Sequence, residues 1–165
     1  DSHDVVHSLI THDGARTPCE RASSWGQISA LEKLSEISVL FVDECQFFHI
    51  ASGDEACDLL HDFFVRLKTS GIQELYLAGL DRDWHGTPFE WISAVSEETK
   101  KLHFILEKDH LYGKCEVCGV EKASRSNRWD NREEKRISVG AGDQYFVCCK
   151  TCFREDKKPT RELAV

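Results

Sequence analysis

Two kinds of side chain in this sequence are spaced so that they could do chemistry: paired thiols and paired carboxylates. The thiols form two C-x-x-C pairs, Cys115 with Cys118 and Cys149 with Cys152, and 30 residues separate the pairs. Each such turn presents two thiolates, and four soft ligands in a tetrahedron select zinc. Four protein ligands leave no coordination position open, so we expect a structural zinc. Redox-active thiols or disulfides are the alternative interpretation.

The carboxylates are Asp43 and Glu44, which directly follow the apolar run Val39–Val42. Such a run is typical of a strand buried on both faces of a parallel sheet, which places both acids at its carboxyl end. Ligands bind at this edge of open α/β sheets, and an acid after an apolar strand often holds the magnesium that bridges phosphates. The alternative is that the two acids begin a surface turn.

The pattern around this strand predicts the elements that position the acids. Apolar residues recur at threes from Trp25 to Ile37, which indicates an amphipathic helix leading into the strand. A second amphipathic helix follows the strand and stops at Gly71. A second strand, Ile72–Leu80, ends in Asp81 and Asp83. Strand, helix and strand form a βαβ unit, which brings two acid-tipped strands to one edge.

The rest of the chain is less regular. We expect a short strand within Asp4–Ile10, a loop over Arg16–Ser24, a short helix over Glu90–Glu98 and a strand over Lys101–Leu106. From Lys108 onward the chain becomes rich in charge and cysteine and poor in aliphatic residues. We therefore predict an α/β domain over residues 1–107 and a small zinc-binding subdomain over residues 108–165.

Composition limits the partners. The formal net charge is -8, from 21 basic and 29 acidic residues, and no long basic run occurs. This argues against nucleic-acid binding, which requires a positive face. No apolar segment reaches membrane-spanning length and no signal-peptide pattern opens the chain, so no membrane contact is expected. Half of the eight cysteines fall in the C-x-x-C pairs, which favours a reduced compartment and predicts a cytoplasmic protein. The start at Asp1, without a methionine, suggests a piece of a longer protein.

Two further segments could contact a ligand. Trp84 and Phe89 flank a short loop with glycine and proline, and they could wall a slot for a flat ring or be ordinary core aromatics. Residues 136–145, between the cysteine pairs, contain Gly140 and Gly142, which permit close backbone approach to a ligand. Main-chain groups there could hydrogen-bond a heterocycle edge, although a plain hairpin turn is the alternative.

Taken in order, these motifs resemble those of the type II thymidine kinases, a tetrameric, zinc-containing family. The matching pieces cover nearly the whole chain: Thr11–Asp13, Phe41–Phe48, Ala78–Asp81, Asp83, Pro88, Phe89, Cys115, Cys118, Ala123, Ser124, Arg128, Val139–Tyr145, Cys149 and Cys152. The resemblance implies an α/β fold like that of P-loop NTPases, a mostly parallel sheet with helices on both faces, joined to a zinc-binding lasso subdomain. It also implies ATP-dependent phosphorylation of thymidine or deoxyuridine at the 5′-hydroxyl, in nucleotide salvage.

The same resemblance assigns roles to residues. Glu44 would be the general base that takes the proton from the nucleoside 5′-hydroxyl, and Asp43 would help hold Mg²⁺. The base pocket and the lasso that covers it would comprise Phe47, Leu80, Trp84, Phe89, Val139, Gly140, Ala141, Gly142 and Tyr145. The implied cofactors are structural Zn²⁺, Mg²⁺ and ATP. The implied partners are the nucleoside and either a homo-tetramer or a homologous kinase domain.

Two departures from the family pattern bear on activity. Members begin with a strand and a phosphate loop G-x-x-x-x-G-K-[ST], whereas the only Gly-Lys here, Gly113-Lys114, precedes Cys115. Without that loop the phosphates of ATP have no backbone cradle, so we expect the chain alone to be inactive. The loop Trp84–Thr87 also differs from the family's. The chain is therefore either part of an active kinase, the interpretation that we favour, or a degenerate domain that binds nucleoside or a partner. A zinc-ribbon interaction module would require the acidic strand ends to be accidental.

Overall fold

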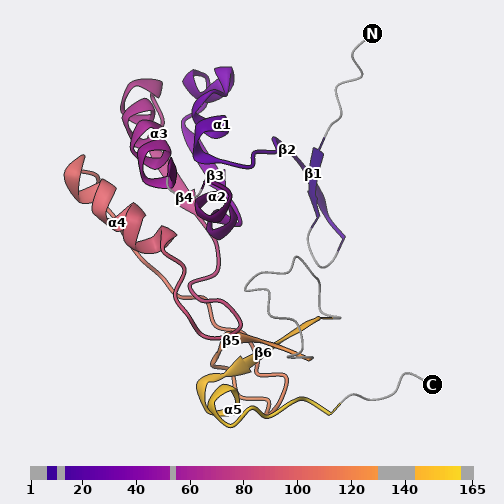
Figure 1. Cartoon of the computed structure of the whole chain (residues 1–165). Helices are drawn as coiled ribbons and strands as arrows, with labels where there is room; N and C mark the ends of the chain where they lie inside the picture. The colour runs from indigo at the N-terminus through magenta and orange to yellow at the C-terminus, as the bar shows by residue number, and fades with distance from the viewer. Residues whose placement is uncertain (1–6, 11–13, 53–54, 130–143, 161–165) are drawn as a thin grey trace.

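The computed structural model describes residues 7–10, 14–52, 55–129 and 144–160. Figure 1 shows an α/β part from β1 to α4 and a smaller unit made of β5, β6 and α5. The elements in chain order are β1 (His7–Ile10), β2 (Arg16–Cys19), α1 (Trp25–Ser29), the short 3-10 helix η1 (Glu32–Ser35), β3 (Val39–Val42), α2 (Cys45–Ser52), α3 (Ala56–Ser70), β4 (Glu74–Leu77), α4 (Trp91–Lys101), β5 (Ala123–Arg128), β6 (Tyr145–Cys149) and α5 (Lys150–Arg154). The predicted mixed α/β class is confirmed. Within the described ranges, no helix has the length and apolar character needed to cross a bilayer.

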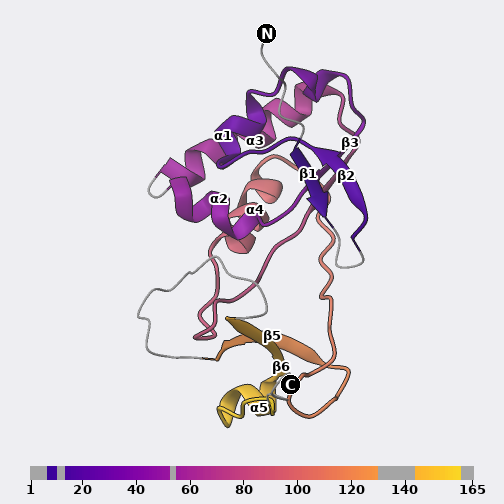
Figure 2. The same ribbon diagram turned by 90° about the vertical axis from the view of Figure 1, so that its right-hand side faces the viewer.

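The two predicted strands β3 and β4 form a parallel pair, in which Val42 lies opposite Leu77. Helices α2 and α3 connect them, so the predicted strand, helix and strand unit is confirmed. Helix α3 ends at Ser70, and Gly71 follows with φ 83°, in the left-handed region that glycine adopts without strain. The loop after β4 runs down to β5 and β6 (Figures 1 and 2).

Helices cover one face of this strand pair. Helix α3 contacts α1, α2 and α4. Their apolar side chains pack with those of β3 in the main core, which includes Trp25, Ile28, Val42, Phe48, Leu60, Phe63, Phe64, Leu67, Phe89, Trp91 and Val95. This core fixes the ends of β3 and β4, where the acids follow.

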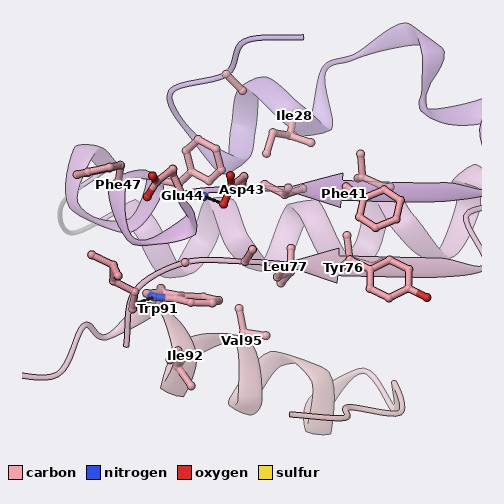
Figure 3. Close-up of a pocket in the computed structure, with 18 of the residues that line it drawn as sticks. Ile28, Phe41, Asp43, Glu44, Phe47, Tyr76, Leu77, Trp91, Ile92 and Val95 are labelled. Carbon is pink, nitrogen blue, oxygen red and sulfur yellow. Dashed lines mark hydrogen bonds between the residues drawn. The ribbon is translucent and has the colours of Figure 1, made fainter. Parts of the chain in front are cut away.

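The opposite face of the strand pair is exposed. Phe41 is 73% exposed and Tyr76 is 50% exposed. Their rings stack with centroids 4.6 Å apart, on the same side of the strands (Figure 3). The prediction of a strand buried on both faces is therefore wrong for the described part of the chain, where no helix covers these rings. Side chains alternate between the two faces of a strand, and an unbroken apolar run does not tell which faces are covered.

Three local predictions were also wrong. The helix predicted over Trp25–Ile37 is interrupted, because α1 ends at Ser29 and η1 follows. Residues 16–19, predicted as loop, form β2, which pairs antiparallel with β1. All four residues of β2 are exposed, so no hydrophobic alternation marks it. The strand predicted over Lys101–Leu106 does not form, because α4 extends to Lys101 and the following residues turn back onto α3.

The unit made of β5, β6 and α5 has a core of its own. Strands β5 and β6 pair antiparallel, and the buried residues between them and α5 are Cys115, Ala123, Phe146, Cys148, Cys149 and Cys152. None of these residues belongs to the main core. The described chain thus contains two separate cores, while the exact division between residues 107 and 108 stays a prediction.

Candidate active site and metal centre

Asp43 and Glu44 lie at the carboxyl end of β3, directly before α2 (Figure 3). Glu44 has φ 58°, in the left-handed region that side-chain-bearing residues rarely adopt. The Glu44 N–H donates to Asp43 Oδ1 at 2.8 Å, which holds this turn. Both carboxylates are exposed. The predicted position of the acids at the strand's carboxyl end is confirmed, and the unusual backbone marks the place as a candidate site.

The side chain of Gln46 connects Glu44 to the end of β4. Gln46 is buried, with 1% of its surface exposed. Its Oε1 accepts a hydrogen bond from the Leu80 N–H at 2.9 Å, and its Nε2 donates to Glu44 Oε2. The N–H of Leu80 can only donate, which fixes the orientation of the amide. The other carboxylate oxygen, Glu44 Oε1, accepts no hydrogen bond within the described ranges and is therefore available to a ligand.

Two further residues make this connection possible. At Gly79 a Cβ atom would lie 2.4 Å from Gln46 Oε1 and 3.1 Å from Cys45 N, so the close approach of these chains requires glycine. Trp91, the first residue of α4, donates from Nε1 to the Leu80 carbonyl oxygen at 2.8 Å. Gln46 and Gly79 lie within the family-like segments Phe41–Phe48 and Ala78–Asp81, but neither they nor Trp91 were predicted to have a role in the site. The one sequence feature that pointed to this connection was Gln46 itself, a polar residue next to the aromatic residues Phe47 and Phe48.

A broad trough opens beside the two acids. It measures about 2390 Å³, more than twice the roughly 300–1,000 Å³ of a typical small-molecule site. Of the predicted base-pocket residues, Phe47 and Leu80 line this trough. Trp84, Phe89 and Tyr145 do not line it, and Phe89 is buried in the main core. The predicted Val139, Gly140, Ala141 and Gly142 lie outside the described residues.

Trp84 and Tyr145 are nevertheless brought together, by a buried arginine between them. The guanidinium carbon of Arg128 lies 5.2 Å from the Trp84 ring centroid and 5.5 Å from the Tyr145 ring centroid. Arg128 is 4% exposed. Cation–π contacts of this kind are strongest when they are desolvated. The stack joins the loop after β4 to β5 and β6, and it replaces the predicted open slot at Trp84.

Of the two acids after β4, Asp83 is a structural residue in this geometry. Asp83 is buried, and its Oδ1 accepts hydrogen bonds from the N–H groups of His85 (3.0 Å) and Thr87 (2.8 Å). Asp81 is half-exposed and lies near Arg82 and Arg125, with carboxylate to nitrogen distances of 3.6 Å and 3.9 Å. Asp43 and Asp81 both line the trough, but Asp43 adjoins Glu44 in the chain and forms no ion pair within the described ranges.

The four predicted zinc ligands come together in the smaller unit. The Sγ atoms of Cys115, Cys118, Cys149 and Cys152 all lie within 4.8 Å of one another, and those of Cys118 and Cys149 are 3.9 Å apart. Tetrahedral zinc with Zn–S bonds of about 2.3 Å has sulfur atoms about 3.8 Å apart. All eight cysteines are free thiols. The donor set and its spacing fit a structural zinc and not a disulfide.

Backbone donors lower the pKa of two of the clustered thiols, Cys115 and Cys149, whereas burial raises the pKa of the Cys152 thiol to about 12. Burial raises the pKa of the Cys115 thiol. Backbone N–H donors, including that of Cys149 at 3.3 Å from the Cys115 Sγ, have the larger and opposite effect and lower this pKa to about 6. The N–H of Cys152 lowers the pKa of the Cys149 thiol. Metal binding requires deprotonated thiols. The neighbouring Cys148 is outside the cluster, and burial raises its pKa to about 11, so the predicted choice of Cys149 over Cys148 is confirmed.

Comparison with known proteins places the chain in a family. A family model described as thymidine kinase matches residues 1–153. A thymidine kinase of Bacteroides thetaiotaomicron is 32% identical over 155 residues, which cover 92% of this chain and 65% of that protein. A thymidine kinase of Rhodothermus sp. is 31% identical, over 92% of this chain and 62% of that protein. A thymidine kinase of Oryza sativa subsp. japonica is 29% identical, over 88% and 48% respectively.

The chain therefore spans less than two thirds of the length of each of these relatives. The match nevertheless runs through the strand-end acids and all four clustered cysteines, which lie between residues 1 and 153. The chain belongs to the thymidine kinase family.

Proposed function

We propose that this chain takes part in transferring the γ-phosphoryl group of ATP to the 5′-hydroxyl of thymidine or deoxyuridine. Family membership and the names of the relatives support this reaction. The observation that carries the proposal is the geometry at Glu44, whose carboxylate is exposed at the end of β3 and tied on one oxygen to Gln46. Its second oxygen is open to the trough. Such a group is suited to accept a proton from a bound hydroxyl.

In this mechanism Glu44 is the general base. Its Oε1 takes the proton of the 5′-hydroxyl while the hydroxyl oxygen attacks the γ-phosphorus and the bond to the ADP oxygen breaks. Gln46 holds Oε2 and so keeps the carboxylate oriented. Asp43 uses one oxygen for the Glu44 N–H, which leaves the other as a hard ligand suited to Mg²⁺. When bound, Mg²⁺ would neutralise charge on the phosphates.

We propose that the nucleoside base lies between side chains of the α/β part and the lasso. Phe47 and Leu80 line the trough and would contact the ring. Tyr145 and Trp84 act through their stack on Arg128, which fixes the end of the lasso, and Phe89 supports the site from the core. Val139, Gly140, Ala141 and Gly142 are proposed to hydrogen-bond the base through main-chain groups.

The wider arrangement is also a proposal. The parallel β3–β4 pair with acids at its edge supports a sheet like that of P-loop NTPases. The sequence contains no G-x-x-x-x-G-K-[ST] motif, so we propose that the chain alone neither binds ATP tightly nor consumes it. A homo-tetramer or a homologous kinase domain would be its assembly partner, and the eight free thiols support a cytoplasmic location.

A second candidate function is nucleoside or partner binding without phosphate transfer. Two observations favour it: Phe89 is buried instead of lining the trough, and Arg128 occupies the space beside Trp84. In this case Glu44 would serve only to bind the nucleoside hydroxyl.

The substitution Glu44→Gln separates the two functions. Thymidine affinity is measured by calorimetry on the chain itself, and turnover is measured with the chain fused to the phosphate-binding loop of a relative. We expect Glu44→Gln to abolish most turnover while affinity stays nearly unchanged, because glutamine keeps the shape but cannot accept the proton. The control is Glu121→Gln, at an exposed acid that does not line the trough. Unchanged turnover in Glu44→Gln would remove Glu44 from the base role, and no turnover in the parent fusion would favour the binding function.

A further inference from the structure

A small pocket lined by basic side chains lies where the β4–α4 loop meets the zinc-binding unit. It measures about 320 Å³, and its charged lining consists of Arg82, His85, Arg125, Lys150 and Arg154. Four of these residues carry a permanent positive charge, and no acidic residue of the described ranges lines the pocket. The chain as a whole has a formal net charge of -8. The pocket is therefore a positively charged site on a protein whose net charge is negative.

The loop side of the pocket is held in shape by internal hydrogen bonds. The buried Asp83 accepts from the N–H groups of His85 and Thr87. Arg82 Nη1 donates to the carbonyl oxygen of Gly86 at 2.8 Å, and Gly86 has φ 83°. The backbone that carries Arg82 and His85 is thus preorganised, which lowers the entropic cost of binding a ligand.

The opposite side of the pocket is anchored by the cysteine cluster. Lys150 and Arg154 stand four residues apart on α5, so they share one helix face. Between them, Cys152 belongs to the four-cysteine cluster. The ring of Phe153 packs against the loop so closely that a Cβ at Gly86 would lie 3.2 Å from it. The loop and α5, which form the two walls of the pocket, therefore contact each other, and each wall is held in place by its own interactions.

The charges of the pocket are only partly balanced. Asp81 lies behind it, with Oδ2 3.6 Å from Arg82 Nε and 3.9 Å from Arg125 Nη1. Lys150 and Arg154 form no ion pair with any residue in the described ranges. Among the described residues, four permanent cations against the two carboxylates of Asp81 and Asp83 leave two positive charges in excess. Like charges gathered in this way repel one another unless an anion joins them.

We propose that this pocket binds a phosphate group. Its charged lining offers only donors at neutral pH apart from the histidine, and guanidinium groups match phosphate oxygens in paired hydrogen bonds. Its volume is near the lower end of the range for small-molecule sites. Arg82, Arg125 and Lys150 also line the trough beside Glu44, so a phosphate ester could extend from the pocket into the trough. Free phosphate and the phosphate of a nucleotide share this chemistry, and the experiment separates the two sources.

Amide NMR titrations of the zinc-loaded chain test the proposal. The ligands are inorganic phosphate, pyrophosphate and thymidine 5′-monophosphate, with thymidine as the control for the nucleoside part and chloride keeping the ionic strength constant. We expect saturable shifts centred on Gly86, Arg125 and Phe153. Tighter binding of the monophosphate than of inorganic phosphate identifies a nucleotide site, and equal binding identifies a site for free phosphate. Absence of saturable shifts near the pocket with all three phosphates overturns the proposal.

A pair of double variants tests the lining directly. Lys150→Gln with Arg154→Gln should weaken phosphate binding roughly tenfold or more, the effect of losing at least one charge-assisted hydrogen bond. Lys114→Gln with Lys122→Gln removes the same charge from exposed positions of the same unit, away from the pocket, and should leave the affinity within about twofold. All four side chains are exposed, and zinc content checks that each variant folds. An equal loss in both double variants would mean general charge attraction and would refute the site.

Discussion

Replacement of Gly79 by alanine tests the contact on which the position of Glu44 depends. The new Cβ would lie 2.4 Å from Gln46 Oε1 and 3.2 Å from Trp91 Cζ2, so the Gln46 amide must move. The buried Gln46 amide oxygen then loses its donor, the Leu80 N–H, and an unsatisfied buried group costs about 1–3 kcal/mol. Crowding in a packed core costs a similar amount, about 1–3 kcal/mol, part of which the movement relieves. We expect Gly79→Ala to lower the free energy of unfolding by roughly 2–4 kcal/mol.

The measurement is urea unfolding of the zinc-loaded chain, followed by tryptophan fluorescence. Gly113→Ala is the matched control, because a Cβ there would meet no atom closer than 3.9 Å. The control should change the free energy of unfolding by no more than about 0.5 kcal/mol. If Gly79→Ala costs as little as Gly113→Ala, then the two strand ends do not approach as described and Gln46 does not bridge them.

Two further predictions concern the metal and the pH dependence of stability. Cys115→Ser should release zinc while Cys148→Ala retains it, and a metal content still at one per chain in Cys115→Ser would show that the ligand assignment is wrong. Burial raises the pKa of Glu98, but hydrogen bonds from Lys101 and His61 outweigh this and lower it below the ordinary value of 4.5. Glu98 therefore stabilises the fold above that value and ceases to do so as the pH falls through its lowered pKa. The stability difference between the parent chain and Glu98→Gln should shrink as the pH falls from 4.5 through the lowered pKa of Glu98, and a constant difference would contradict this.

The cysteine cluster and the position of the two strand-end acids could be predicted, because each depends on residues close together in the sequence. A C-x-x-C turn presents its two thiols whatever the rest of the chain does, so all four cysteines and the choice of Cys149 over Cys148 could be predicted. An apolar strand followed by acids likewise places Asp43 and Glu44 at the strand's end. The parallel pairing of β3 and β4 followed from the strand, helix and strand order.

The parts that failed depend on tertiary contacts. Whether Phe41 faces a helix or solvent is decided by other segments, and the apolar run looks the same in both cases. Phe89 and Trp84 were given the same role, yet one packs in the core and the other stacks on Arg128, which is 44 residues further along the chain. The sequence indicates that a large aromatic side chain in a loop will be packed against other groups, but it does not tell which groups those are.

The connection through Gln46 changes what determines the position of the candidate base. Glu44 follows β3, yet its carboxylate is held by Gln46 of α2, which in turn accepts from Leu80 after β4. Leu80 is fixed on its other side by Trp91 at the start of α4. The backbone of Leu80 is thus hydrogen-bonded at both its N–H and its carbonyl oxygen, and it cannot shift without breaking one of the two bonds. A change in the segment between β4 and α4 must therefore alter the position of Glu44, even though no described residue of that segment forms a hydrogen bond or ion pair with the carboxylate.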